Sequence, residues 1–254
     1  MVYFVGAGSG AVDLITVRGK NLLEKADVII YAGSLVNPGL LEYGKKDCEI
    51  YNSAYMNLEE VMKVMLEADS KGKTVVRLHT GDPSIYGAIR EQMDILTKNH
   101  VSYEVCPGVS SFCAAAASLQ AEYTLPGVSQ SVIITRISGR TKVKDEESLR
   151  SYAAHQASMV IFLSMGYADK VAQELIEGGY SKDTPAAIVY KASWEDEKIV
   201  RCPLEELGEA ARREHIEKTA LIVVGHFLGN DYELSKLYDS EFTTMYREGR
   251  AAKD

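Results

Sequence analysis

The sequence predicts an α/β protein of two domains, each with a mainly parallel sheet, and with a cleft between the domains. The first observation is that short runs rich in valine and isoleucine alternate with helix-length segments along the chain. The runs are apolar at successive positions, which is typical of strands buried on both faces of a parallel sheet. The second observation is a polar, turn-rich stretch, AEYTLPGVS, at residues 121–129. We therefore predict domains at residues 1–125 and 126–254.

The elements follow from these patterns in chain order. Short apolar runs rich in β-branched residues are expected to form strands. These runs are residues 2–5, 28–31, 74–78, 131–135, 159–163, 186–190 and 220–224. Helices are expected at residues 16–25, 58–69, 84–97, 111–119, 146–155, 167–177 and 204–213. The polar stretch 230–254 has no clear partner strand, and no structure is predicted for it.

Composition excludes several classes of protein. No uninterrupted apolar stretch approaches the roughly 20 residues that a membrane-spanning helix needs, and the first residues lack a signal-peptide pattern. The four cysteines are scattered without a CxxC pair, which indicates reduced thiols in a cytoplasmic protein. The net charge of −8 argues against nucleic acid as a partner. The five histidines show no metal-ligand spacing, so no protein-bound metal is expected.

The first strand runs into a glycine-rich stretch, VYFVGAGSGAVDLITVRG, at residues 2–19. Gly6, Gly8 and Ala11 fit the spacing of a dinucleotide-binding fingerprint. That fingerprint also needs an acidic residue at the end of the second strand, and this chain has VIIYAGS there. The helical pattern begins only near Thr16, so the helix dipole would not face a phosphate at the glycines. An NAD-dependent oxidoreductase is therefore the less favoured alternative.

Two further strand ends carry small residues. The stretch RLHTGDPSIYGAIREQM, residues 77–93, places Asp82 as a helix N-cap and Pro83 at the first helical position. In YEVCPGVSSF, a strand meets Pro107 and Gly108 just before a helix that begins at Ser110 or Ser111. Ligands of open α/β sheets bind at such carboxyl ends. None of the three strand ends carries a P-loop lysine. Together they therefore favour a ligand that has hydroxyl groups and no bulky anionic group.

Six motifs, VGAGSGAVDLITVRG, HTGDPSIYG, CPGVSSFCAAAA, TRISGRT, IFLSMG and TALIVVG, resemble in order and spacing those of the tetrapyrrole methylases. These are two-domain enzymes that use S-adenosylmethionine (SAM), and the likeness covers residues 2–228. The segments YAGSLVNPGLLEY and TRISGRTKV are similar to those of members that act on precorrin-4. The resemblance implies methyl transfer to carbon 11 of precorrin-4, with or without cobalt, in cobalamin biosynthesis.

The resemblance also implies site residues. Cofactor contacts, for SAM or its product S-adenosylhomocysteine (SAH), are expected from Thr80, Gly81, Asp82, Ile85, Tyr86, Ser110, Ser111, Met165, Ala187, Ala192, Thr219 and Ala220. From sequence alone, Met165 would be read as core packing at a strand end. The floor of the substrate trough is expected from Gly6, Gly8, Ser9, Gly10 and Asp13. Cobalt is expected only as part of the substrate.

The stretch TRISGRTKVK is the densest basic segment. Arg136 and Arg140 are candidates for binding the carboxylates of a tetrapyrrole, and the alternative is a solvated loop. No catalytic residue is expected, because the reacting carbon of the reduced ring is already electron-rich. A homodimer is expected, since shallow α/β halves leave apolar helix faces to cover. Another tetrapyrrole, or a macromolecule such as ribosomal RNA or an elongation factor, remains the alternative substrate.

Overall fold

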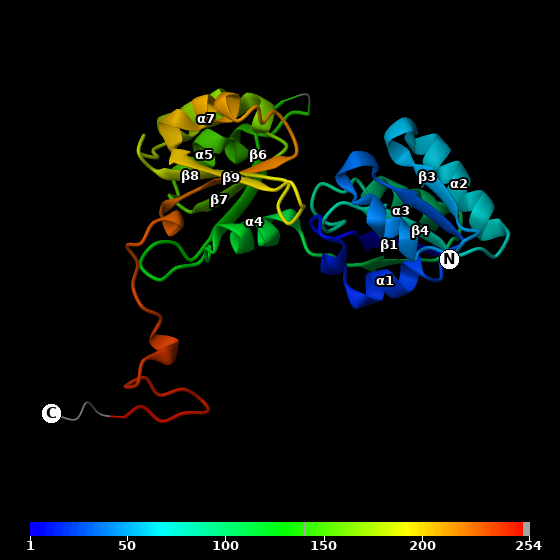
Figure 1. Cartoon of the computed structure of the whole chain (residues 1–254), viewed down its shortest axis with the longest axis horizontal. Coiled ribbons are helices and arrows are strands. Elements are labelled where there is room, and N and C mark those ends of the chain that lie inside the picture. Colours follow the sequence, from blue (N-terminus) through cyan, green and yellow to red (C-terminus); the bar gives the residue numbers. More distant parts are fainter. Residues whose placement is uncertain (140, 251–254) are drawn as a thin grey trace. The chain divides into compact units, whose positions relative to one another are not determined.

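The computed structural model describes residues 1–139 and 141–250, and the chain divides into two compact units. The first unit holds Met1–Ser118 together with Lys191–Lys198. The second holds Leu119–Tyr190 and the residues from Ile199 onward. Figure 1 shows the first unit mainly in blue and cyan and the second mainly in green, yellow and orange. A short segment from late in the chain is therefore part of the first unit.

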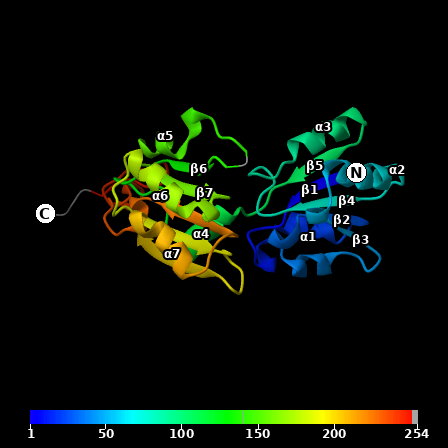
Figure 2. The same ribbon diagram turned by 90° about the horizontal axis from the view of Figure 1, so that it is seen from above.

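The first unit is built on a five-stranded sheet with the order β3-β2-β4-β1-β5, which can be followed from edge to edge in Figure 2. Its strands are β1 (Val2–Gly6), β2 (Val28–Tyr31), β3 (Glu49–Asn52), β4 (Val75–His79) and β5 (Tyr103–Cys106). All four neighbouring pairs are parallel. Because parallel strands end at the same edge, the loops that follow β1, β4 and β5 lie next to one another.

Helices cover both faces of this sheet. They are α1 (Val17–Leu23), α2 (Leu58–Ser70) and α3 (Arg90–Lys98), and α4 (Ser111–Leu119) follows β5. On one face, apolar residues of α2 and α3 such as Met65 and Leu96 pack against Phe4 and Ile30. On the other face, Leu23 of α1 packs in a cluster with strand residues that include Val5, Ile29 and Leu78. The sheet is thus buried on both sides, as its apolar strands predicted.

The second unit contains a five-stranded sheet with the order β6-β7-β10-β8-β9. Its strands are β6 (Val132–Arg136), β7 (Ser158–Phe162), β8 (Pro185–Tyr190), β9 (Lys198–Pro203) and β10 (Ala220–Val224). The pair β6–β7 is parallel, but β10 runs antiparallel to both β7 and β8. The expectation of a mainly parallel sheet is therefore wrong for this unit. Successive residues Ile222, Val223 and Val224 are all fully buried, so apolarity alone did not reveal strand direction.

One face of the second sheet is covered by α5 (Leu149–Ala153), α6 (Ala168–Glu177) and α7 (Leu207–Arg213). Their apolar residues, among them Val171, Leu175 and Leu207, form a single cluster with Ile161 and Ile222 of the strands. The helices α5 and α7 are each preceded by a 3₁₀ turn and are shorter than the predicted segments. In the part of the chain that the structure describes, no helix combines the length and apolarity that crossing a membrane requires.

One predicted helix differs from the structure, and two strands of the structure were not predicted. The helix expected at residues 84–97 begins only at Arg90, because Tyr86 and Ala88 adopt left-handed backbone angles with φ of 56° and 50°. Such residues do not continue a right-handed helix. The strands β3 and β9 were not predicted. Both are edge strands with several exposed residues, so they lack a continuous apolar run.

Candidate functional site

The candidate site lies at the carboxyl edge of the first sheet, where the loops after β1, β4 and β5 meet. The first two loops pair through their backbones at Gly8 and Gly81. The Gly8 amide donates to the Gly81 carbonyl at 3.3 Å, and the Gly81 amide donates to the Gly8 carbonyl at 2.9 Å. The Ala7 amide also donates to the His79 carbonyl at 2.7 Å. The glycine-rich loop after β1 is therefore fixed to the loop after β4.

Three glycines bring these loops into direct backbone contact. A Cβ atom on Gly6 would lie 2.6 Å from both the Gly108 Cα and the Gly81 carbonyl oxygen. A Cβ atom on Gly108 would overlap the same carbonyl oxygen and lie 2.7 Å from the Gly6 Cα. Gly81 itself has φ of +62°, a region that favours glycine. The close approach of the three strand ends therefore requires glycine at these positions.

Asp82 ties the loop after β4 to the loop after β5. Its Oδ2 accepts a hydrogen bond of 2.8 Å from the Gly108 amide, and its Oδ1 accepts one of 2.8 Å from the Ser84 amide. The Ser84 hydroxyl donates to the same Oδ1. Burial alone would raise the pKa of Asp82, but the hydrogen bonds from Ser84 and Gly108 lower it overall. The predicted N-cap role is wrong, because the helix that follows Asp82 begins only at Arg90.

The structure brings the predicted cofactor residues of the first unit together. Thr80, Gly81 and Asp82 form one loop, and the missing Cβ of Gly81 faces the Ser110 Cα at 3.4 Å and the Ser111 amide at 3.5 Å. The same loop continues through a turn in which the Ile85 amide donates to the Asp82 carbonyl. Tyr86 follows, with its side chain exposed. These residues surround one short stretch of the sheet edge.

A second set of contacts holds the glycine-rich loop from the segment Lys191–Lys198. The hydroxyl oxygens of Ser9 and Ser193 are 2.9 Å apart, and the Ala11 amide donates to the Ser193 hydroxyl at 3.1 Å. A Cβ atom on Gly10 would overlap the indole ring of Trp194. Neither Ser193 nor Trp194 was predicted as a site residue. The available signals were that Trp194 is the single tryptophan of the chain and that both residues follow the predicted Ala192.

The remaining predicted substrate residues lie apart in the sequence. Asp13 is exposed in a 3₁₀ turn, Val12–Leu14. Arg136 ends β6, and its guanidinium donates to the backbone carbonyls of Ile137, Thr141 and Lys142. Arg136 therefore shapes the basic loop that follows β6. Arg140 lies outside the described residues.

The predicted cofactor residues of the second unit occupy strand ends and the sheet itself. Met165 begins a 3₁₀ turn after β7 and belongs to the hydrophobic core of its unit. This agrees with the interpretation of Met165 as a core residue at a strand end. Ala187 lies within β8 and is fully buried. Thr219 has φ of 58° and precedes Ala220, the first residue of β10. Their contact with a cofactor stays a prediction.

Beneath the loops, β4 carries two buried basic side chains. His79 is 4% exposed, and burial together with the charge of Arg77 lowers its pKa to about 3. Its Nε2 has no hydrogen-bond partner among the described residues. Burial also lowers the pKa of Arg77 to about 10, and its guanidinium donates to the Ile30 carbonyl at 3.1 Å. His79 is therefore neutral at physiological pH and supplies no charge to the site.

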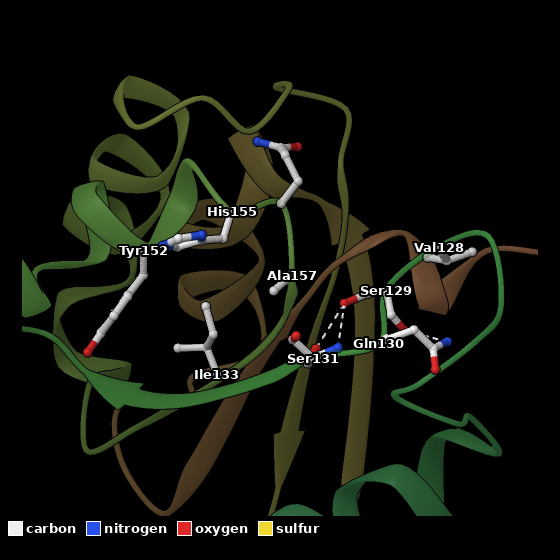
Figure 3. A pocket seen from close by; sticks show the side chains of 9 residues that line it. Val128, Ser129, Gln130, Ser131, Ile133, Tyr152, His155 and Ala157 are labelled. Atoms are coloured by element: carbon white, nitrogen blue, oxygen red, sulfur yellow. Dashed lines mark hydrogen bonds between the residues drawn. The ribbon is translucent and has the colours of Figure 1, made fainter.

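A separate pocket of about 440 Å³ is found in the second unit (Figure 3). It lies at the start of β6 and the end of α5, and its lining includes Ser129, Ser131, Tyr152 and His155. In Figure 3, Ser129 is hydrogen-bonded to Ser131, beside the start of β6. The lining contains none of the predicted site residues.

Comparison with known proteins gives concordant results. The family model described as tetrapyrrole (corrin/porphyrin) methylases matches residues 1–208. The cobalt-precorrin-4 C(11)-methyltransferase of Methanocaldococcus jannaschii is 59% identical over 97% of this chain and 96% of that protein. The enzyme of the same name from Priestia megaterium is 47% identical, with 98% of each chain covered. The precorrin-4 C(11)-methyltransferase of Pseudomonas aeruginosa is 42% identical over 98% of this chain and 99% of that protein.

Solved structures show the same architecture. The X-ray structure of a cobalt-precorrin-4 methyltransferase, a cobalamin biosynthetic enzyme, matches with a TM-score of 0.88 and 47% identity, covering 90% of this chain and 96% of that one. A uroporphyrin-III C-methyltransferase from Thermus thermophilus, complexed with S-adenosylhomocysteine, matches with a TM-score of 0.76 and 28% identity over 89% and 98% of the chains. On the family model and on these full-length relatives, the chain belongs to the tetrapyrrole methylase family.

Proposed function

We propose that this chain transfers the methyl group of SAM to carbon 11 of cobalt-precorrin-4 in cobalamin biosynthesis. The observation that carries the proposal is the 59% identity, over almost the full length of both chains, to a relative of that name. A second relative of the same name is 47% identical, whereas the relative named for metal-free precorrin-4 is 42% identical. This order favours the substrate that contains cobalt.

The residues at the first sheet edge fit the amino acid and ribose portions of SAM. The Asp82 carboxylate is ionised at neutral pH, its pKa being lowered further by its hydrogen bonds, and it suits a ligand that carries positive charge. Ser110 and Ser111 supply hydroxyl and amide groups beside Gly81. Glycine at positions 6, 81 and 108 leaves no side chain over the backbone there. Met165, Ala187, Ala192, Thr219 and Ala220 remain the proposed surroundings of the adenine.

The chemistry requires little from the protein beyond alignment. SAM supplies an electrophilic methyl group, and a bond from the ring carbon to methyl forms as the methyl–sulfur bond breaks. The ring carbon would be the nucleophile, SAH would leave with the electron pair of the broken bond, and the proton that the ring loses would pass to the substrate or to solvent. Holding reacting atoms at about 3–3.5 Å accounts for much of the acceleration in such a displacement. The rigid backbone contacts among Gly6, Gly81 and Gly108 suit this task.

The glycine-rich loop is the proposed floor for the tetrapyrrole. Gly6, Gly8 and Gly10 let this loop pack closely on Gly108, Leu14 and Trp194, and the loop would offer its backbone to a flat ring system. Arg136 and Arg140 are the proposed ligands of its carboxylates, and Arg136 also holds the loop through three backbone carbonyls. We further propose that the chain works in the cytoplasm as a homodimer. Sedimentation at micromolar concentration would test the dimer. A monomer under those conditions would contradict the dimer.

Incubation of the purified chain with methyl-labelled SAM tests the substrate. Separate reactions would contain cobalt-precorrin-4, metal-free precorrin-4 and uroporphyrinogen III. We expect label in cobalt-precorrin-4 at the highest rate, and calorimetry should show binding of SAH but not of NADH. Label in uroporphyrinogen III alone would support a different tetrapyrrole as the substrate. Binding of NADH without binding of SAH would contradict methyl transfer altogether.

A further inference from the structure

The segment Lys191–Lys198 joins β8 to β9, yet it belongs to the first compact unit. There it contacts residues 6–11, which we call the glycine loop. Ser193 makes two polar contacts with this loop: its hydroxyl oxygen lies 2.9 Å from the Ser9 hydroxyl and accepts from the Ala11 amide at 3.1 Å. One hydroxyl group therefore fixes two positions of the glycine loop.

Glu197 holds Ser193 in place. Its Oε2 accepts a hydrogen bond of 2.6 Å from the Ser193 amide and another of 2.6 Å from the Ser118 hydroxyl. Ser193 has φ of 68°, a left-handed conformation that a residue with a side chain rarely adopts. Unusual backbone angles of this kind persist where neighbouring contacts enforce them, and they cluster at functional sites. The Glu197 carboxylate is such a contact, because it binds the Ser193 amide directly.

Trp194 contacts the glycine loop at the next position. A Cβ atom on Gly10 would overlap the Trp194 indole and lie 2.9 Å from its Cγ. The indole therefore occupies the space that a side chain at position 10 would need. The Lys191 ammonium lies 5.4 Å from the centroid of the Trp194 ring and forms an ion pair with Asp196. These contacts hold the indole from within its own segment.

We propose that Ser193, Trp194 and Glu197 are positioning residues that hold the glycine loop in the shape that receives the tetrapyrrole. The proposal rests on the proposed function, in which this loop is the floor of the substrate site. The Ser193 hydroxyl contacts Ser9 and Ala11, and the Trp194 indole packs against Gly10 between them. The Glu197 carboxylate accepts a hydrogen bond from the Ser193 amide. These three residues thereby set the affinity for the tetrapyrrole, while Ala192 and the loops at Thr80–Asp82 and Ser110 are left to the cofactor.

Matched glutamate variants test this role. Glu197→Gln changes the carboxylate that binds Ser193, whereas Glu195→Gln changes an exposed carboxylate two residues away in the same segment. Ser193→Ala removes the hydroxyl that contacts Ser9 and Ala11. We expect Ser193→Ala and Glu197→Gln to raise the KM for cobalt-precorrin-4 about tenfold, the change that corresponds to loss of one ordinary hydrogen bond. SAH affinity measured by calorimetry should change less than about twofold, and Glu195→Gln should match the wild type.

Tryptophan emission gives a readout that needs no substrate. Trp194 is the only tryptophan of the chain, so emission of the free protein reports on its contact with Gly10. We expect Glu197→Gln to shift the emission to longer wavelength, as water reaches the indole, and Glu195→Gln to leave it unchanged. If Glu197→Gln matches Glu195→Gln in both emission and KM, the positioning role is wrong. Equal losses of SAH and tetrapyrrole affinity would also overturn it, because they would indicate a general disturbance of the first unit.

A double-mutant cycle tests the contact between Gly10 and Trp194. Gly10→Ala should raise the KM in the wild type, because the added methyl group displaces the indole. In the Trp194→Ala background the same change should have a much smaller effect. Equal effects in both backgrounds would contradict the inferred contact. If the wild type fails to methylate cobalt-precorrin-4, the proposed function is wrong. The tryptophan emission of the variants without substrate still tests the contact between Gly10 and Trp194.

Discussion

Replacement of Asp82 by alanine tests the connection between the loop after β4 and the loop after β5. In the wild type, the carboxylate accepts hydrogen bonds of 2.8 Å from the Gly108 amide and from the Ser84 amide. Asp82→Ala leaves both amides without this acceptor. Gly108 packs against the backbones of Gly6 and Gly81, so its amide has little room to find another partner. The loop after β5 should therefore loosen relative to the loop after β4.

The size of the effect follows from these bonds. A hydrogen bond to a charged group contributes about 1.5–3 kcal/mol when it is protected from water. The bond from Ser84 lies at the surface, where water replaces it at small cost, so the bond from Gly108 dominates. We expect Asp82→Ala to lower the free energy of unfolding by about 2 kcal/mol and to weaken SAH binding about tenfold or more. Asp82→Asn keeps one acceptor oxygen and should lose about half as much stability.

Urea denaturation followed by circular dichroism, with calorimetry of SAH, measures both effects. The pKa of Asp82 is lowered in the folded chain from its ordinary value of 3.8. Its stabilising effect is therefore complete above that ordinary value and is lost as the pH falls through the lowered pKa. The difference in stability between the wild type and Asp82→Asn should therefore shrink below about pH 4. A loss below about 0.5 kcal/mol for Asp82→Ala at pH 7, with unchanged SAH affinity, would refute the reasoning.

Three further perturbations test neighbouring features. Gly108→Ala should destabilise the chain by at least about 2 kcal/mol, because its Cβ would meet backbone atoms of Gly6 and Gly81; a stability equal to the wild type in urea would contradict that packing. His79→Leu should flatten the pH dependence of the free energy of unfolding. Below about pH 6.5 the histidine of the unfolded chain binds a proton that buried His79, with its pKa of about 3, does not, so the free energy of unfolding of the wild type falls by up to about 1.4 kcal/mol for each unit that the pH decreases. Equal slopes in the two proteins would contradict this. Arg136→Gln together with Arg140→Gln should weaken tetrapyrrole binding by at least about 1 kcal/mol, while the affinity for SAH stays nearly unchanged. Titration with both ligands measures this, and an equal loss of affinity for the two ligands would indicate damage to the fold.

Strands β1 and β4 could be predicted because nearly all of their residues are buried, whereas β5 has two exposed residues and was located by the small residues that follow it. Apolar runs located β1, β2, β4 and β10, and small residues after β1, β4 and β5 located the three loops. Strand direction in the second unit was beyond this signal. A strand buried on both faces is apolar whichever way its neighbours run, as β10 illustrates.

Other features depended on contacts distant in the sequence. Asp82 and Pro83 have the composition of a helix start, but the left-handed backbone at Tyr86 and Ala88 delays the helix to Arg90. The predicted cap instead binds the Gly108 amide, 26 residues further along the chain. The contact between Ser9 and Ser193 spans 184 residues, and no local pattern marks Ser193 as a partner. Composition predicted which residue types gather at the edge, whereas tertiary packing decides what each one binds.

The ring carbon that receives the methyl group distinguishes methyl transfer to carbon 11 from every other methylation of the ring. The purified chain would be incubated with cobalt-precorrin-4 and SAM labelled with carbon-13 in its methyl group, and the product would be examined by NMR. We expect a single labelled methyl group, attached to carbon 11 of the ring. A labelled methyl at any other carbon, or a cobalt-precorrin-4 that stays unlabelled while another tetrapyrrole is methylated, would contradict it.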